Sequence, residues 1–112
     1  MLINVKKIYS MQNPESEAIV RRFFEALELL RRARHIRGLQ SFTRRYGINR
    51  RNVQTLQKEP HRDIFQVSWL ARLVEDYGVS ASWLLLGVGD PGIDLDSLPK
   101  TAKRLQQKNP PL

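Results

Sequence analysis

The sequence predicts an all-α protein with one folded domain. Apolar residues recur at helical spacing in five separate stretches, and residues that start or stop helices stand at the ends of these stretches. No stretch alternates as a strand does, apart from the opening "LINV", which fits a short strand or an unstructured arm equally well. A chain of 112 residues is long enough for one compact core. We therefore expect a five-helix domain over residues 15–90, between an N-terminal arm of residues 1–14 and a C-terminal tail of residues 91–112.

The first helix is expected over residues 15–34. Pro14 suits a helix start, and the negative charges of Glu15 and Glu17 are favoured beside the free N–H groups of a first turn. Gly38 lies just beyond the expected end. The apolar residues recur three and four positions apart and predict the buried stripe: Ile19, Val20, Phe23, Phe24, Leu27 and Leu30.

Two short helices joined by a tight turn are expected next. The stretch "LQSFTRRYG" predicts the second helix, with Gly47 where the chain leaves helical geometry. Asn49 suits the start of the third helix because its side-chain oxygen can accept a free backbone N–H. That third helix covers "RRNVQTLQK" and ends before Pro60. The second helix is expected to turn one side inward, formed by Leu39, Phe42 and Tyr46.

The fourth helix is expected over residues 67–77 and the fifth over residues 81–86. Gly78 closes the fourth, Ser80 caps the fifth and Gly87 stops it. The fourth helix is expected to bury Val67, Leu70, Leu73 and Val74. In the fifth, Trp83 with Leu84 and Leu86 is interpreted as core packing rather than as a ligand cage. In the polar tail "PKTAKRLQQK" fits a loose helix, which "NPPL" cannot continue.

Positive charge is concentrated in one part of the chain. The whole sequence carries 19 Lys and Arg against 11 Asp and Glu, a net charge of +8. Residues 21–62 alone hold twelve cations and three anions, so this window is +9 and the remainder is −1. All of these cations except Lys58 are arginine, whose planar, forked donors suit phosphate groups. The window predicts either a polyphosphate partner or a solvated surface.

Several classes of protein are not supported by the sequence. There is no cysteine, so disulfides and thiolate metal sites are excluded. His35 and His61 are isolated and form no recognisable metal set, and no nucleophile is spaced to pair with a base. No apolar run suits a signal peptide or a membrane span. We expect a cytoplasmic protein that is not an enzyme and needs no cofactor.

The second and third helices with their turn have the spacing of a helix-turn-helix. Small or apolar residues at five positions would hold the two helices together: Thr43, Gly47, Ile48, Val53 and Leu56. Anchoring this inner face leaves the other face of the third helix exposed. That face would carry Arg50, Arg51, Asn52, Gln54, Thr55 and Lys58. Arg can bond guanine at two acceptors and Asn or Gln can bond adenine in the same way, so this face is suited to a DNA major groove.

Residues 18–90 resemble the phage-repressor-like, Cro-type helix-turn-helix family, also called the xenobiotic-response-element (XRE) group. "FTRRYGINRRNVQTLQK" is similar to the two-helix signature of the family. "LARLVEDYGVSASWLLLGVGDP" is similar to the end of the domain in many bacterial members. The resemblance implies a lambda repressor-like domain that binds double-stranded DNA as a homodimer, with its third helix in the major groove.

The resemblance also implies which residues contact DNA. The base-contacting positions fall on Arg50, Arg51 and Asn52, with Gln54 and Thr55 within reach. Phosphate contact falls at the start of the second helix, on Leu39 and Gln40, and after the third helix. The expected phosphate-contacting residues are Gln40, Arg44, Lys58, His61 and Arg62; for Arg44 and its neighbour Arg45, plain solvation is the alternative.

The chain departs from the family pattern at four places. Leu39 stands where Gln is frequent, so Gln40 would have to supply that phosphate contact, and Thr43 replaces a usual Ala. Gln57 stands where a Glu often pairs with an Arg of the first helix. "KEP" replaces the usual Gly after the third helix, so the path of the next loop is open.

Two other functions remain open. The same fold serves protein-interaction modules such as an antitoxin or antirepressor subunit, in which the partner would bind an apolar surface on residues 93–112 or on "LINV". RNA binding is less favoured because no aromatic residues interleave with the basic run to stack on bases. A small-molecule ligand is not expected, because the tail is too short for a sensing domain. The leading hypothesis is a transcriptional regulator, most simply a phage or mobile-element repressor.

Overall fold

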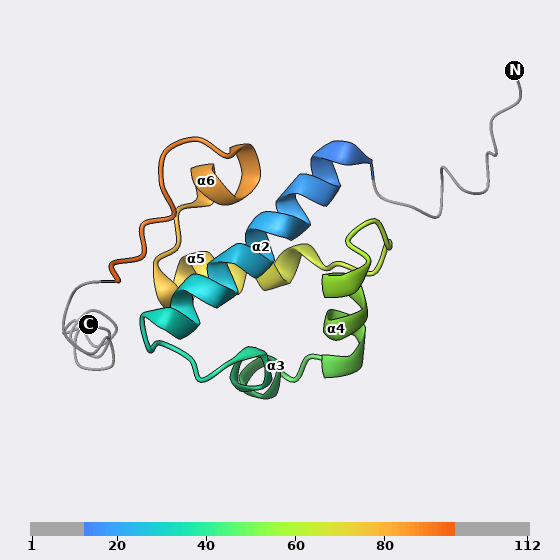
Figure 1. Ribbon diagram of the computed structural model, residues 1–112, viewed down its shortest axis with the longest axis horizontal. Coiled ribbons are helices and arrows are strands. Elements are labelled where there is room, and N and C mark those ends of the chain that lie inside the picture. Colours follow the sequence, from blue (N-terminus) through green and yellow to red (C-terminus); the bar gives the residue numbers. More distant parts are fainter. Residues whose placement is uncertain (1–12, 96–112) are drawn as a thin grey trace, which may run out of the picture.

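A computed structural model of the protein describes residues 13–95 and contains five helices in this range (Figure 1). They are α2 Pro14–Arg32, α3 Leu39–Tyr46, α4 Arg50–Lys58, α5 Val67–Tyr77 and α6 Ala81–Leu86. Residues 13–95 contain no strand, so the all-α prediction is confirmed for this part of the chain. The expected strand or arm at "LINV" and the expected helix in the tail lie outside the described residues.

The long helix α2 crosses the molecule, with α5 behind it in the view of Figure 1. The short helices α3 and α4 lie on one side of this pair, and α6 lies on the other. The Phe23 ring of α2 is fully buried at the centre. Its centroid lies 5.7 Å from that of Phe42 in α3, 5.9 Å from that of Trp69 in α5 and 5.2 Å from that of Phe65 in the loop before α5. One aromatic residue therefore joins α2, α3 and α5, and its edge-on contacts with Phe42 and Phe65 add to the stabilisation from burial.

Three of the helices have an N-cap, in which the side chain of the residue just before the helix accepts a hydrogen bond from the first turn. Asn13 Oδ1 accepts from the Ser16 N–H at 2.7 Å, Asn49 Oδ1 from the Asn52 N–H at 3.1 Å and Ser80 Oγ from the Trp83 N–H at 3.2 Å. The caps at Asn49 and Ser80 confirm the sequence prediction, and the cap at Asn13 was not predicted. Each cap satisfies a backbone donor that would otherwise have no partner in the first turn.

Arg22 of α2 ties the far helix α6 to the domain. Its Nε donates to the Leu84 carbonyl at 2.8 Å and its Nη2 to the Leu85 carbonyl at 3.1 Å. These carbonyls lie in the last turn of α6, where helical partners are missing and the helix dipole is negative. The guanidinium group therefore caps the C-terminal end of α6.

The structure corrects three sequence predictions. The first helix ends at Arg32 rather than residue 34, because Arg34 adopts a left-handed φ of 66°. In α5, Val67 and Val74 are exposed, at 76% and 37%, although both were predicted to be buried. Leu86, at the last position of α6, is 73% exposed.

The error in α5 has a geometric cause. The helix buries Trp69, Leu70, Leu73 and Tyr77, and the two aromatic side chains determine which side faces the core. At about 100° per residue, Val67 and Val74 then lie roughly a quarter-turn away from the centre of that side. The other core predictions for this part of the chain, Leu70, Leu73, Trp83 and Leu84, are confirmed.

Candidate nucleic-acid interface

Helix α4 has one buried side and one exposed side. Val53 and Leu56 are fully buried and hold it against the core. Helical geometry places Arg51 and Lys58 opposite these two residues, with Gln54 close beside them. The side chains predicted to contact bases are exposed except for half-buried Thr55: Arg50, Arg51, Asn52, Gln54 and Thr55. The amphipathic pattern therefore presents long polar side chains to solvent on a short, anchored helix.

The turn between α3 and α4 fixes how the two helices meet. Gly47 ends α3 with a left-handed φ of 64°, a conformation that residues with a side chain rarely adopt. The Ile48 N–H then donates to the Thr43 carbonyl at 2.9 Å. Thr43 itself is buried and its hydroxyl donates to the Gln40 carbonyl at 3.2 Å. A small buried residue therefore allows α3 and α4 to approach each other, as its position in the sequence predicted.

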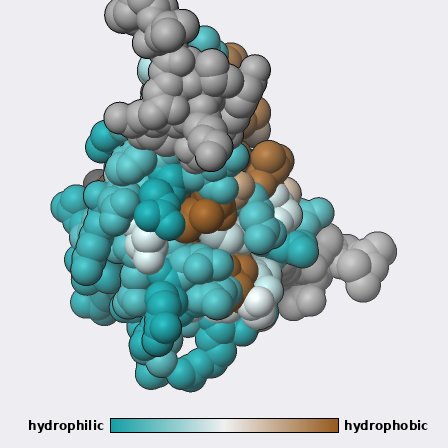
Figure 2. All heavy atoms as spheres, turned by 90° about the vertical axis from the view of Figure 1, so that its right-hand side faces the viewer, coloured by the Kyte–Doolittle hydropathy of each residue, from teal (hydrophilic) through white to brown (hydrophobic). Residues whose placement is uncertain are grey.

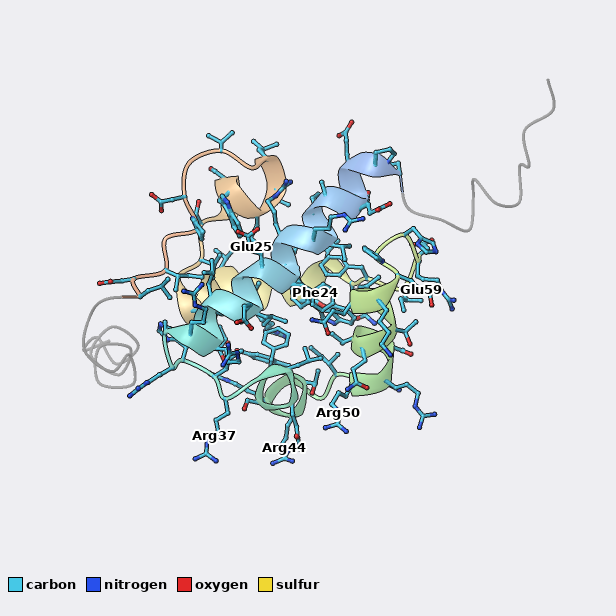
Figure 3. All side chains as sticks on the ribbon, viewed as in Figure 1. Phe24, Glu25, Arg37, Arg44, Arg50 and Glu59 are labelled. Atoms are coloured by element: carbon cyan, nitrogen blue, oxygen red, sulfur yellow. The ribbon has the colours of Figure 1, made fainter. Side chains whose placement is uncertain are left out.

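An open groove of about 520 Å³ joins the start of α3 to the exposed side of α4. Three arginines from different segments, Arg37, Arg44 and Arg50, project on this side of the molecule in Figure 3. We call it the α3–α4 groove; its lining residues are Arg37, Gly38, Leu39, Gln40, Ser41, Arg44, Arg50 and Gln54. The structure thus brings together two predicted phosphate-contacting residues, Gln40 and Arg44, with two predicted base-contacting residues, Arg50 and Gln54.

Two of the remaining predicted base-contacting residues, Arg51 and Asn52, line other hollows, and Thr55 lines none of the three. Arg51 lines an adjoining hollow with Asn49, Arg50 and Gln54. Asn52 lies on the opposite flank of α4, in a hollow of about 330 Å³ that reaches Gln66 and Ser68 at the start of α5 and Arg72 in its middle. The face of the molecule that carries α4 is mostly hydrophilic, with small hydrophobic patches (Figure 2).

The cations of residues 21–62 divide into paired and unpaired groups. On α2, Arg21 Nη2 lies 2.6 Å from a Glu17 carboxylate oxygen and Arg31 Nη2 lies 2.6 Å from one of Glu28. The Arg31 hydrogen bond lowers the pKa of the Glu28 carboxyl group. Within residues 13–95, five exposed cations of α3, α4 and the loop before α3 form no ion pair: Arg37, Arg44 and Arg50 in the groove, Arg51 beside it and Lys58 at the far end of α4. The local positive charge of the α3–α4 surface is therefore not neutralised by the protein.

Three predicted phosphate-contacting residues lie away from the α3–α4 groove. Lys58 is the last residue of α4, about 12 Å along the helix axis from Arg50, and His61 and Arg62 follow it. Glu59 marks this end in Figure 3, opposite Arg50. Its carboxylate lies 3.5 Å from Arg62 Nη1 and 3.9 Å from His61 Nε2. The structure does not bring these residues together with Gln40 and Arg44, and Glu59 offsets part of their charge.

Sequence reasoning missed the arginine at the entrance to α3 and misjudged Arg45, which lies outside the groove. Arg37 was not among the predicted contacts, although it directly precedes the start of α3, where phosphate contact was expected. Arg45 was expected to contact phosphate or be solvated, but its Nη1 donates to the Tyr77 hydroxyl at 3.1 Å. Only the spatial neighbours of α3, which are distant in sequence, distinguish Arg45 from Arg44.

Residues 13–95 contain no cluster of three or more His, Cys, Asp or Glu side chains that suits a metal ion. No helix in the same range is both long enough and apolar enough to cross a bilayer. Comparison of the chain with family models, curated proteins and solved structures gave no match.

Proposed function

We propose that the protein is a sequence-specific, double-stranded DNA-binding transcriptional regulator that places α4 in the major groove. The observation that carries this proposal is the α3–α4 groove, in which Arg37, Arg44 and Arg50 gather without carboxylate partners in the described residues. The resemblance of residues 18–90 to phage-repressor-like helix-turn-helix proteins supports a repressor of phage or mobile-element type.

The residue types around the groove match the two parts of DNA recognition. Arg50, Arg51 and Gln54 carry planar groups that can bond a guanine or an adenine at two positions at once. Arg37, Arg44 and the start of α3 are suited to phosphate, since no side chain caps the N–H groups of that helix start. In this arrangement the α3 residues fix the register on the backbone and the α4 residues read the bases.

An apolar surface supports the proposal that the regulator acts as a homodimer. Leu85, Leu86 and Val88 are 48%, 73% and 59% exposed at the end of α6, on the side of the molecule opposite α4. Exposed apolar residues that lie close together along the chain offer a surface that a protein contact can bury. Two copies joined symmetrically would present two α4 helices to a two-fold operator.

Selection of binding sites from a random duplex pool tests the proposal. We expect a two-fold site whose half-sites lie about one helical turn, 34–36 Å, apart, because a symmetric dimer places its recognition helices on one face of DNA. Footprinting should protect the major groove of both half-sites. Recovery of no enriched sequence, with equal affinity for every duplex, would contradict sequence-specific recognition.

A protein-interaction module is the second candidate, and the same apolar residues of α6 favour it. In that case Leu85, Leu86 and Val88 would bind a different protein, and the arginines of the groove would only solubilise the chain. A stoichiometric heteromeric complex with no retardation of duplex DNA would favour this function over the first.

A further inference from the structure

A cluster of charged and aromatic side chains joins the end of α3 to the second half of α5. The Tyr46 hydroxyl donates to Asp76 Oδ2 at 2.5 Å, and Arg45 Nη1 donates to the Tyr77 hydroxyl at 3.1 Å. Arg45 Nη2 also lies 3.8 Å from the same Asp76 oxygen. Arg72 of α5 also belongs to this group, through a contact with the Tyr46 ring described next. We call the five residues the Tyr46 cluster: Arg45, Tyr46, Arg72, Asp76 and Tyr77.

Cations cover the aromatic rings of the Tyr46 cluster. The Arg45 guanidinium carbon lies 5.2 Å from the Tyr46 ring centroid and 5.5 Å from that of Tyr77, while that of Arg72 lies 5.4 Å from the Tyr46 ring. These distances are within the range of cation–π attraction. The Asp76 side chain is 15% exposed, so its bond to Tyr46 is shielded from water. Tyr46 is therefore held by two guanidinium groups at its ring and by Asp76 at its hydroxyl.

The cluster lies directly against the turn that leads into α4. Tyr46 is the last residue of α3, and Gly47 follows it with the left-handed φ. Tyr46 and Arg72 also line the same hollow as Asn49 and Asn52, the N-cap and the third residue of α4. Any displacement of Tyr46 would pass through a three-residue turn to the first turn of α4.

Outside the Tyr46 cluster, α3 is held by a few apolar contacts, among them the half-buried Leu39 and the contact of Phe42 with Phe23. This helix has eight residues, and Phe42 and Thr43 are the only ones that are buried. Phe42 packs on the Tyr46 ring with a centroid distance of 5.0 Å, so its position also depends on Tyr46. The hydrogen bond from Tyr46 to Asp76, with the bond from Arg45 to Tyr77 beside it, therefore ties the end of α3 nearest to α4 to α5 with a direction that apolar contacts lack.

We propose that Tyr46 and Asp76 are positioning residues for DNA recognition: their hydrogen bond fixes the orientation of α4 relative to the phosphate-contacting start of α3. This inference rests on the proposed function. Base contacts require Arg50, Arg51 and Gln54 to be in register with the backbone contacts of Gln40 and Arg44. Non-specific binding requires only the positive charge of the surface. Loss of the hydrogen bond should therefore reduce discrimination between sequences and leave general DNA affinity unchanged.

Tyr46→Phe tests the inference, because it removes the hydroxyl and keeps the ring against Phe42, Arg45 and Arg72. Affinities of the full chain for its selected site and for a scrambled duplex are measured well below the unfolding temperature. We expect the ratio of the two affinities to fall about tenfold, the range of one lost bidentate base contact, with the scrambled-duplex affinity within about twofold of wild type. Asp76→Ala, which also removes the contact with Arg45, should lower the ratio at least as much, and the double variant should be no worse than Asp76→Ala because the Tyr46 hydroxyl acts through Asp76.

Asn13→Ala is the matched control. It removes the N-cap of α2, at the far end of that helix from α3, and so destabilises the fold without touching the cluster. We expect it to retain the wild-type affinity ratio. In the absence of DNA, hydrogen exchange of the Ile48 N–H, which bonds to the Thr43 carbonyl, should accelerate in Tyr46→Phe more than in Asn13→Ala.

Two negative outcomes are distinguishable. A wild-type chain that binds its selected duplex selectively, with an unchanged affinity ratio in Tyr46→Phe, would overturn this inference alone. A wild-type chain with no selectivity for any duplex would overturn the proposed function and this inference with it.

Discussion

Arg51 is the residue of α4 best suited to test whether a side chain contacts bases or only adds positive charge to the surface. It is exposed, stands opposite Val53 and Leu56 on the helix, and lines a hollow with Asn49, Arg50 and Gln54. No residue of the described chain pairs with it. Its five donors are therefore available to an external acceptor.

Changing Arg51 to Ala should weaken binding to the selected site by about 1 to 3 kcal/mol, the discrimination supplied by one bidentate base contact. Binding to scrambled duplex should weaken much less. Fluorescence anisotropy with both duplexes at one salt concentration measures the two losses. Gln57→Ala is the control, since Gln57 is exposed on the same helix but does not line the groove. Equal losses on the two duplexes for Arg51→Ala would assign this side chain to phosphate instead.

Arg44 should behave differently because it lies on α3, beside the predicted backbone contacts. Changing Arg44 to Ala should weaken binding to every duplex alike and lower the slope of log affinity against log salt by about 0.9, the value for one phosphate contact. A salt titration of wild type and variant on scrambled duplex measures this slope. Arg21→Ala, which removes an exposed arginine paired with Glu17 on α2, should leave the slope unchanged. A reduced slope in Arg21→Ala would indicate a general effect of net charge.

The sequence could identify the groove residues only in part. Exposed residues of α4 follow from the helical period once Val53 and Leu56 are taken as buried, so Arg50, Arg51 and Gln54 were predictable. The different environments of Arg44 and Arg45 were not, because Tyr77, which bonds Arg45, is 32 positions away in the chain. The prediction that Val67 is buried was wrong for the same reason, because the orientation of α5 depends on how Trp69 and Tyr77 pack against other helices.

At the scale of the elements, the contact between α3 and α5 makes stability sensitive to alkaline pH. Burial is the main cause, and the hydrogen bond to Asp76 the second, that raises the pKa of the Tyr46 hydroxyl well above its ordinary value of 10.0. Above that value a tyrosine in the unfolded chain loses its proton while folded Tyr46 keeps it. The unfolded state then binds fewer protons, so the free energy of unfolding falls as pH rises.

Wild type should be more stable than Tyr46→Phe below about pH 10, where the hydroxyl donates to Asp76, and this advantage should shrink as pH rises further. Urea unfolding of both proteins at about pH 8 and about pH 11 measures the difference. Taking the difference removes the contribution of lysine titration, which the two chains share. An advantage that stays constant over this range would show that Tyr46 has an ordinary pKa.

The boundaries of the elements were largely predictable because capping is local. Asn49 and Ser80 bond to N–H groups three residues later, and Gly47 provides the left-handed turn itself, so short stretches contain the whole cause. The end of α2 was placed two residues too late because Arg34 gives no such local signal. Its left-handed φ arises where the chain turns back toward α3.

At the scale of the whole molecule, α2 and α6 are joined across 62 residues by the bonds from Arg22 to the end of α6. Changing Arg22 to Ala should lower the free energy of unfolding by about 1.5 to 3 kcal/mol, the range for hydrogen bonds from a charged donor. Urea unfolding measures the loss. Arg21→Ala, its exposed neighbour in an i, i+4 pair, should cost about 0 to 1 kcal/mol. Similar losses for the two variants would show that the α6 carbonyls find other partners.

The all-α class and the order of the helices followed from periodicity and caps, whereas the joining of α2 to α6 did not. The position of Arg22 in the sequence does not distinguish it from Arg21. The acceptors of Arg22 are backbone carbonyls, which every residue has, so no residue type in the sequence marks them. The sequence likewise predicted a basic window without showing which cations would be paired. The distribution of charge over the surface emerged only when the helices were assembled.

The α3–α4 groove is lined entirely by residues 37–54, a single uninterrupted stretch of the chain. On the proposed function, a cassette of that length, moved into another helical scaffold by one recombination event, would carry its DNA preference with it. The recipient would need a carboxylate at the place of Asp76, because Tyr46 travels with the cassette and its partner does not. Retargeting by exchange should therefore succeed only between scaffolds that already share this acceptor.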